Sequence, residues 1–318
     1  DGSDMAIVGK IEHRKGRHGR RGRLKSLAFL PAMMSLGNLL CGFTAIFFAM
    51  RAVVAATLMP ESTYELPGNL LELMLPSFLS LGAGLVIVAM VFDGLDPLLA
   101  RVTRTRNDFG SQLDSLADIV SFGIAPATLM IAFMTLQLQS DKILPSPVSA
   151  HVLGRFAWVC SAIYVAFTAI RLARHNVEYI SPKRGRREFR GLPTSAGAAV
   201  IVSLLIFQDQ EMGETLRPYL VYVVPSLSVV TAFLMISTVP YMRFHRTYLV
   251  GRQPFGQFIG LMMIVAVFWI YKAPTLVLLV LWYLASGPVS AFVRRIRGED
   301  QDDEDFFTLP FDQSRASG

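Results

Sequence analysis

Four aspartates occur in two closely spaced pairs in this sequence. Asp93 and Asp96 are three residues apart, and Asp114 and Asp118 are four residues apart. Residues at these spacings lie on one face of an α-helix, so each pair would present two carboxylates on the same side of its helix. Because only the short segment 97–113 separates the pairs, the two helices are expected to be neighbours and the four carboxylates to converge.

Four carboxylates in a small volume repel one another and are costly to place at the edge of a membrane. A divalent cation would offset both costs, and oxygen-only ligands on rigid helices suit magnesium, manganese or calcium rather than zinc. The small residues Ala100 and Gly110 would leave room for a bulky ligand, and Arg101 could meet a phosphate. The alternative is that the aspartates cap helix ends and pair with nearby arginines, but the spacing of all four favours a metal site.

The elements that must position these residues are predicted to be transmembrane helices. Of the 318 residues, 53% are hydrophobic and only 17% are charged, whereas roughly a quarter are charged in a typical soluble domain. Charge-poor stretches that could cross a bilayer as helices are 29–50, 74–92, 116–140, 151–170, 191–208, 218–240, 255–271 and 274–293. The expected fold class is therefore all-α, a polytopic transmembrane helix bundle with about eight spans.

The chain is expected to divide into four segments. They are a basic cytoplasmic tail over 1–27, the main transmembrane domain over 28–240, an additional transmembrane hairpin over 241–297 and an acidic disordered tail over 298–318. The hairpin is expected because Lys272 and Pro274 interrupt a long apolar run with a charge and a helix breaker.

Basic residues occur in every second predicted loop. The positive-inside rule then places both termini and the aspartates on the cytoplasmic side of a cell membrane. The arginine-rich N-terminal segment is expected to contact anionic lipid headgroups. No nucleic-acid partner is expected, because aromatic residues are not interleaved with these arginines.

The aspartates belong to a longer pattern in the sequence. It reads Asp93-x-x-Asp96-x-x-x-Ala100-Arg101, followed by Gly110-x-x-x-Asp114-x-x-x-Asp118. This pattern resembles the signature of the CDP-alcohol phosphotransferases, membrane enzymes that displace CMP from a CDP-linked lipid with an alcohol. Pro97 departs from the family pattern, which usually has glycine there, and proline removes a backbone donor.

Further segments resemble the phosphatidylserine synthase branch of that family. They are 36–43, 114–127, 171–176 and 189–194, with His175 where phenylalanine is expected. The resemblance implies transfer of a phosphatidyl group from CDP-diacylglycerol to the hydroxyl of L-serine, with release of CMP. It also implies a homodimer, in a prokaryotic cell membrane.

The resemblance assigns a role to each residue of the pattern. The implied ligands of two magnesium or manganese ions are Asp93, Asp96, Asp114 and Asp118. Asp118 would also act as the general base. The implied CDP-lipid-binding residues are Gly94, Ala100, Arg101, Gly110 and Asn38. The implied acceptor-binding residues are Arg171, Arg174 and Arg190, since guanidinium binds carboxylate in a bidentate fork.

Alternatives remain open for the acceptor site and for the function. Arg171 and Arg174 could equally be positive-inside charges at the end of a span. The same reaction class could use glycerol phosphate, inositol phosphate or choline as the acceptor. A transporter or a non-catalytic metal-binding membrane protein is the other alternative. Transporters usually contain pseudo-symmetric halves with interrupted helices, and this sequence shows no internal repeat.

Overall fold

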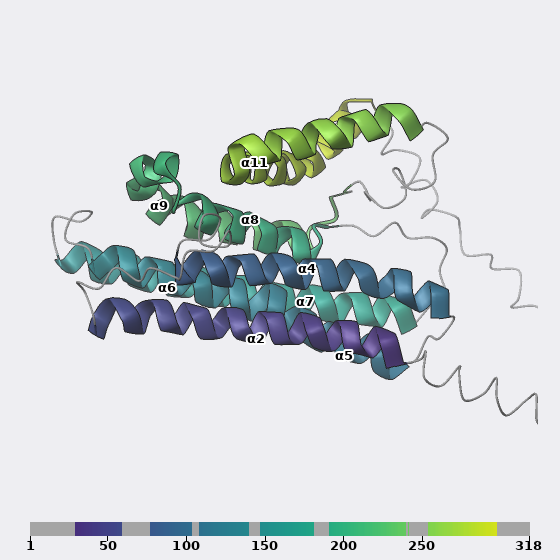
Figure 1. Ribbon diagram of the computed structural model, residues 1–318, viewed down its shortest axis with the longest axis horizontal. Helices are drawn as coiled ribbons and strands as arrows, with labels where there is room; N and C mark the ends of the chain where they lie inside the picture. Colours follow the sequence, from purple (N-terminus) through teal and green to yellow (C-terminus); the bar gives the residue numbers. More distant parts are fainter. Residues whose placement is uncertain are drawn as a thin grey trace, which may run out of the picture.

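The computed structural model describes residues 29–58, 77–103, 108–139, 147–180, 191–239, 241 and 254–297. All regular secondary structure in this part of the chain is helical (Figure 1). The helices are α2 (Phe29–Leu58), α4 (Phe78–Thr103), α5 (Asp108–Asp118), the π-helix η1 (Ile119–Ile124), α6 (Ala125–Gln139), α7 (Pro147–Ile180), α8 (Thr194–Phe207), α9 (Glu211–Ile236) and α11 (Pro254–Arg297). The prediction of an all-α fold is therefore confirmed.

Six helices among the described residues are long and apolar enough to cross a membrane. They comprise Ala32–Leu58, Phe78–Asp96, Gly110–Gln139, His151–Val177, Thr215–Ile236 and Ala273–Val293. The predicted span 191–208 corresponds to α8, which is apolar but has only 14 residues, fewer than the roughly 20 that a full crossing requires. The predicted span 255–271 is helical, but its side chains lie outside the described set. The expected count of about eight spans is not confirmed.

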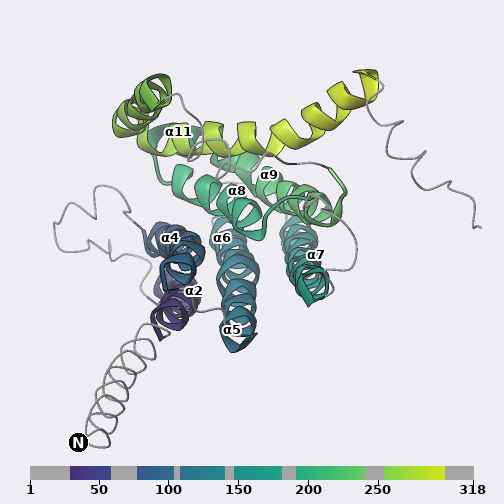
Figure 2. The ribbon, with the colours of Figure 1, turned by 90° about the vertical axis from the view of Figure 1, so that its right-hand side faces the viewer.

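The helices form a bundle covered by a second layer. α2, α4, the continuous α5–η1–α6 rod and α7 lie side by side with their long axes in a similar direction (Figure 1). α8 packs on α4 and α6, α9 packs on α7, and α11 packs on α8. Figure 2 shows this order from one end, with α11 farthest from α2 and α5. The aspartate-bearing segments of α4 and α5 lie at one end of the bundle, where α2 packs against both helices.

Small residues let the first helices approach closely. A Cβ added to Gly42 of α2 would lie 2.7 Å from the Ser121 Cα, and one added to Gly82 of α4 would lie 2.8 Å from Leu129 Cδ2. Helices in membranes associate through such close packing, because lipid is as apolar as the side chains and supplies little hydrophobic drive. The contact at Gly42 fixes α2 directly against η1, beside Asp118.

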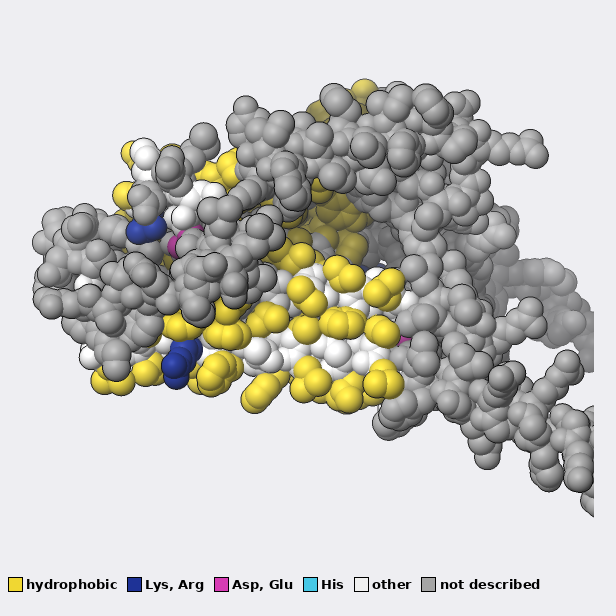
Figure 3. Space-filling model, in the orientation of Figure 1, with side chains coloured by type: hydrophobic (Ala, Val, Ile, Leu, Met, Phe, Trp, Pro, Cys, Tyr) yellow, Lys and Arg dark blue, Asp and Glu magenta, His cyan; other side chains and the backbone are white. Residues whose placement is uncertain are grey.

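The outward face of α2 is apolar along its whole length. Large exposed side chains repeat every three or four residues, as expected for one helical face; they are Met33, Leu36, Leu40, Phe43, Phe47, Met50 and Val54. Hydrophobic side chains cover much of the described surface along the bundle in Figure 3. This pattern matches a surface that contacts lipid acyl chains, so the chain is an integral membrane protein.

The C-terminal segment differs from the sequence-based expectation. α11 is one helical element from Pro254 to Arg297, with Pro274 and Pro288 inside it. The structure thus has no helix end at Lys272 or Pro274, where the sequence predicted one. Instead, the two halves of α11 point in different directions (Figure 2). Proline kinks a helix without ending it where the flanking residues are apolar and must keep their backbone hydrogen bonds. The predicted tails 1–27 and 298–318 lie outside the described residues.

A buried polar cluster fastens the end of the bundle opposite to the aspartate pairs. The Asp209 carboxylate, between α8 and α9, accepts hydrogen bonds from the Ser77 and Ser80 hydroxyls at the start of α4. Gln208 Nε2 donates to Asp209 Oδ1 at 2.7 Å, and Arg217 Nη2 donates to the Gln208 carbonyl at 3.2 Å. Hydrogen bonds to an ionised group are stronger than neutral ones, so this cluster ties α4 to the covering layer.

Replacing Ser80 by alanine should therefore destabilise the bundle. Ser80 is fully buried, and loss of its hydrogen bond to a carboxylate costs about 1.5–3 kcal/mol. We expect a lower unfolding temperature for Ser80→Ala than for wild type in detergent. The matched control is Ser226→Ala, because the exposed Ser226 hydroxyl bonds only to the Tyr222 carbonyl of its own helix among the described groups. Equal unfolding temperatures for the two variants would contradict the structural role of the cluster.

Candidate metal site

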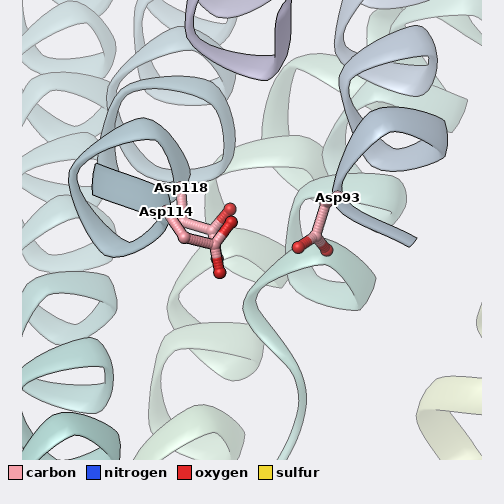
Figure 4. Close-up of side chains that lie close together, drawn as sticks. All are labelled: Asp93, Asp114 and Asp118. Carbon is pink, nitrogen blue, oxygen red and sulfur yellow. The ribbon is translucent and has the colours of Figure 1, made fainter. Parts of the chain in front are cut away.

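Three of the four aspartates meet between α4 and α5. One carboxylate oxygen from each of Asp93, Asp114 and Asp118 lies within 4.8 Å of the other two. Asp93 comes from α4, while Asp114 and Asp118 are one turn apart on α5. Figure 4 shows the three carboxylates directed into the space between the two helices. The spacing in the sequence thus correctly indicated these three neighbours.

Asp96 is the exception to the expected convergence of four. It lies outside the group of three and accepts a hydrogen bond of 3.2 Å from Ser35 Oγ of α2 at its Oδ2 atom. The hydrogen bond from Ser35 turns the Asp96 side chain toward α2. Asp96 nevertheless lies within electrostatic range of Asp93 and Asp114.

The donor set fits a divalent cation. Within the described part of the chain, the buried Oδ1 atoms of Asp96 and Asp114 have no hydrogen-bond donor. Buried polar atoms in proteins are nearly always partnered, because an unpaired one loses its hydration without compensation. An all-oxygen set of carboxylates with unused lone pairs is the ligand chemistry that magnesium, manganese and calcium prefer.

Among the described residues, Arg171 is a cationic side chain within electrostatic range of this cluster. It lies on α7, partly buried, and its guanidinium interacts electrostatically with Asp118 and Asp93. Its Nη1 atom also donates to Thr194 Oγ1, at the first residue of α8, over 3.2 Å. One guanidinium offsets one of the three negative charges, and a divalent cation would offset the other two. Arg171 and a bound divalent cation would together balance the three carboxylates.

Asn38 of α2 holds Asp118 in place. Its Nδ2 atom donates to Asp118 Oδ1 over 3.0 Å, and the residue is fully buried. The carbonyl of Asn38 in turn accepts a hydrogen bond of 2.8 Å from Ser121 Oγ. The structure thus places Asn38 against the carboxylate, which favours a positioning role over the CDP-lipid contact expected from the sequence.

The π-helix η1 begins directly after Asp118. Its wider turn is seen where the Ala125 N–H bonds to the carbonyl of Val120, five residues back. The buried Tyr164 hydroxyl of α7 donates to the Phe122 carbonyl over 2.7 Å. Single π turns inside α-helices often occur at functional sites. The π-helix joins α5, which carries Asp114 and Asp118, to the buried helix α6. The spacing of residues in the sequence did not predict it.

The other expected site residues are distributed around the cluster. Cβ atoms built on Gly94 and Gly110 would meet no atom of the described residues within 4 Å. Arg174 is exposed on α7, unlike Arg171. Ala100 and Arg101 lie in α4, as does Pro97, but their side chains are outside the described set, and Arg190 is outside the described residues.

This fold and site define the class of protein: a helical integral membrane protein with an aspartate cluster at one end of its bundle. The chain belongs to the CDP-alcohol phosphatidyltransferase family, which it matches over residues 28–239. The match includes all four aspartates, Asn38 and Arg171. It ends before α11.

Several similar proteins share one name. The chain is similar to proteins named CDP-diacylglycerol–serine O-phosphatidyltransferase from three organisms. It is 32% identical to the Helicobacter pylori protein over 166 residues, covering 51% of this chain and 60% of the relative. It is 28% identical to the Mycobacterium leprae protein over 194 residues, covering 60% and 51%. It is 30% identical to the Methanocaldococcus jannaschii protein over 176 residues, covering 55% and 68%. The aligned segments thus span between half and about two thirds of these relatives.

Loss of one carboxylate should weaken metal binding at this site. We expect Asp93→Asn to lower the affinity of the purified protein for Mn²⁺ by roughly tenfold or more, since even groups that only support metal ligands are worth 10–100-fold. Titration with Mn²⁺, with the free ion followed by electron paramagnetic resonance, would measure this affinity. Asp209→Asn is the matched control, because it removes a carboxylate at the other end of α4 and keeps an oxygen for Ser77 and Ser80. Equal affinities for the two variants would exclude Asp93 as a ligand.

Proposed function

We propose that the chain transfers a phosphatidyl group from CDP-diacylglycerol to the hydroxyl of L-serine, forming phosphatidylserine and CMP. The observation that carries this proposal is the cluster of Asp93, Asp114 and Asp118 facing Arg171, in a chain that belongs to the CDP-alcohol phosphatidyltransferase family. The shared name of the relatives supports CDP-diacylglycerol and serine as the two substrates.

The metal ligands would be Asp93, Asp114 and Asp118, with Asp96 available to a second ion. Bound magnesium or manganese would supply the positive charge that neutralises the pyrophosphate and the departing CMP. A bulky nucleotide could approach the carboxylates past Gly94 and Gly110, since a Cβ added to either would meet no described atom within 4 Å. The polar parts of the lipid would then lie at the end of the bundle while its acyl chains stay among the apolar helix faces.

Asp118 is the proposed general base. Asn38 holds its Oδ1 atom, so Oδ2 is the oxygen left to receive a proton. As Asp118 takes the proton from the serine hydroxyl, the serine oxygen attacks the lipid-side phosphorus and the bond from that phosphorus to CMP breaks. A base fixed by a buried hydrogen bond needs little rearrangement at the moment of reaction.

Arg171 is the proposed partner of the serine carboxylate. A guanidinium can bind a carboxylate through two parallel N–H bonds, which also fixes its orientation. Arg171 lies across from Asp118, so a serine held by its carboxylate could direct its hydroxyl toward the base. Arg174 and Arg190 remain proposed as outer contacts of the same acceptor.

The proposed setting is the cytoplasmic face of a prokaryotic cell membrane. Support comes from the arginine-rich loops predicted on the side of the bundle that carries the aspartates. A homodimer is proposed as the assembly. The exposed apolar face of α2 is compatible with contact either with lipid or with a second copy.

Release of CMP by purified protein tests the function directly. With CDP-diacylglycerol and Mn²⁺, we expect CMP release to depend on added L-serine and to fall by roughly 10²–10⁴-fold in Asp118→Asn, the usual contribution of a general base. Asp209→Asn, which lies at the opposite end of α4, should retain activity. Release that depends on another alcohol would contradict the choice of serine, and no release with any alcohol would contradict the reaction itself.

A further inference from the structure

Asp118 and Ser121 both form hydrogen bonds with the same residue of α2. The Asn38 Nδ2 atom donates to Asp118 Oδ1 over 3.0 Å, and the Asn38 backbone carbonyl accepts a hydrogen bond of 2.8 Å from Ser121 Oγ. Asn38 and Ser121 are fully buried, and Asp118 is nearly so. Asp118 and Ser121 are three residues apart, so both lie on the side of the α5–η1–α6 rod that is turned toward α2.

The Asn38 side chain has no second anchor among the described residues. Its Oδ1 atom is buried and has no hydrogen-bond donor in this part of the chain. The direction of the Nδ2 atom toward Asp118 is therefore set by where the α2 backbone lies at Asn38, and Ser121 bonds to that backbone directly. A shift of α2 away from η1 would take the 3.0 Å bond to Asp118 toward the limit of hydrogen-bond geometry.

Gly42 makes the approach of Ser121 to α2 possible. It lies one turn after Asn38, and a Cβ added to it would collide with both the side chain and the backbone of Ser121. A larger residue at position 42 would push α2 away from η1. The absence of a side chain on α2 thus admits the hydroxyl from η1.

η1 is held from the other side by α7. Figure 2 shows the rod that contains η1 between α2 and α7. The Tyr164 hydroxyl of α7 donates to the Phe122 carbonyl over 2.7 Å. A Cβ added to Gly123 would lie 3.2 Å from Thr168 Cγ2, so α7 lies close to η1 there as well. These contacts keep η1 from moving away from α2, and Ser121 therefore donates from a fixed place.

We propose that Ser121 is a positioning residue for Asp118, acting through Asn38. This inference rests on the proposed function, in which Asp118 is a metal ligand and the general base. The Ser121 hydroxyl fixes the α2 backbone at Asn38, and the Asn38 amide fixes Asp118 Oδ1. Oδ2 then has a defined place from which to accept the proton. Ser121 itself contacts no substrate and takes no part in the proton transfer.

Ser121→Ala tests the proposal, because it removes one hydroxyl and adds no atom to the close contact with Gly42. In the Mn²⁺ titration we expect the affinity to fall roughly tenfold, the lower end of the effect of groups that support metal ligands. At saturating Mn²⁺ we expect kcat for serine-dependent CMP release to fall by a similar factor, with the KM for L-serine changed less than about twofold.

Ser161→Ala is the matched control. Ser161 is also buried, but its hydroxyl donates to the Ala157 carbonyl of its own helix. The control should leave the Mn²⁺ affinity, kcat and the KM for L-serine unchanged.

A double-mutant cycle determines whether Ser121 acts through the Asn38 amide. Asn38→Ala removes the amide but keeps the backbone carbonyl to which Ser121 bonds. In the Asn38→Ala background we expect Ser121→Ala to lower the Mn²⁺ affinity and kcat no further, whereas the effects of independent sites add. Additive losses would overturn the inference, since Ser121 would then act independently of Asn38.

The remaining outcomes separate this inference from the proposed function. Unchanged Mn²⁺ affinity and kcat in Ser121→Ala, with an active wild type, would overturn the inference alone. A lower unfolding temperature with unchanged Mn²⁺ affinity would also overturn it, because Ser121 would then contribute only to stability. A wild type that binds Mn²⁺ but shows no serine-dependent CMP release would contradict the proposed function, while the Mn²⁺ titrations would still decide whether Ser121 positions Asp118.

Discussion

Repulsion among the clustered carboxylates is the interaction on which the rest of this structure depends. Asp93, Asp114 and Asp118 bring three carboxylates within 4.8 Å at the end of a bundle whose exposed face along α2 is apolar. Such charges are expensive near hydrocarbon, so the surrounding helices must hold them against their own repulsion. Asn38 on α2 and Arg171 on α7 approach the cluster from two directions. A divalent cation would neutralise the remaining negative charge. Metal binding would therefore reduce the repulsion that the helix packing must otherwise resist.

The packing supplies the rigidity that this balance requires. Gly42 lets α2 touch the backbone of η1, and the hydrogen bond from Tyr164 satisfies a carbonyl of the π-helix. At the far end of α4, Asp209 ties the covering layer to the bundle. These contacts fix the helices at both ends of the bundle. Gly94 and Gly110, which have no described atom within 4 Å of an added Cβ, lie at the end that carries the aspartates.

Part of this arrangement could be predicted from the sequence, for clear physical reasons. Hydropathy indicated helices that span a membrane, and the four-residue spacing of Asp114 and Asp118 placed both on one face of α5. Asp96 could not be assigned in the same way, because its partner Ser35 is 61 residues away. The contact between Asn38 and Asp118 bridges 80 residues and depends on packing between helices. The same holds for η1 and for the continuation of α11 through Pro274, neither of which has a local signal in the sequence.

The central claim is that the three aspartates form a metal site between α4 and α5. The most direct test is a structure of the protein with Mn²⁺, in which anomalous scattering locates the ion. We expect an anomalous peak among the carboxylates of Asp93, Asp114 and Asp118, with Asn38 still bonded to Asp118. Manganese bound only elsewhere, or three carboxylates paired solely with protein groups at saturating Mn²⁺, would contradict it.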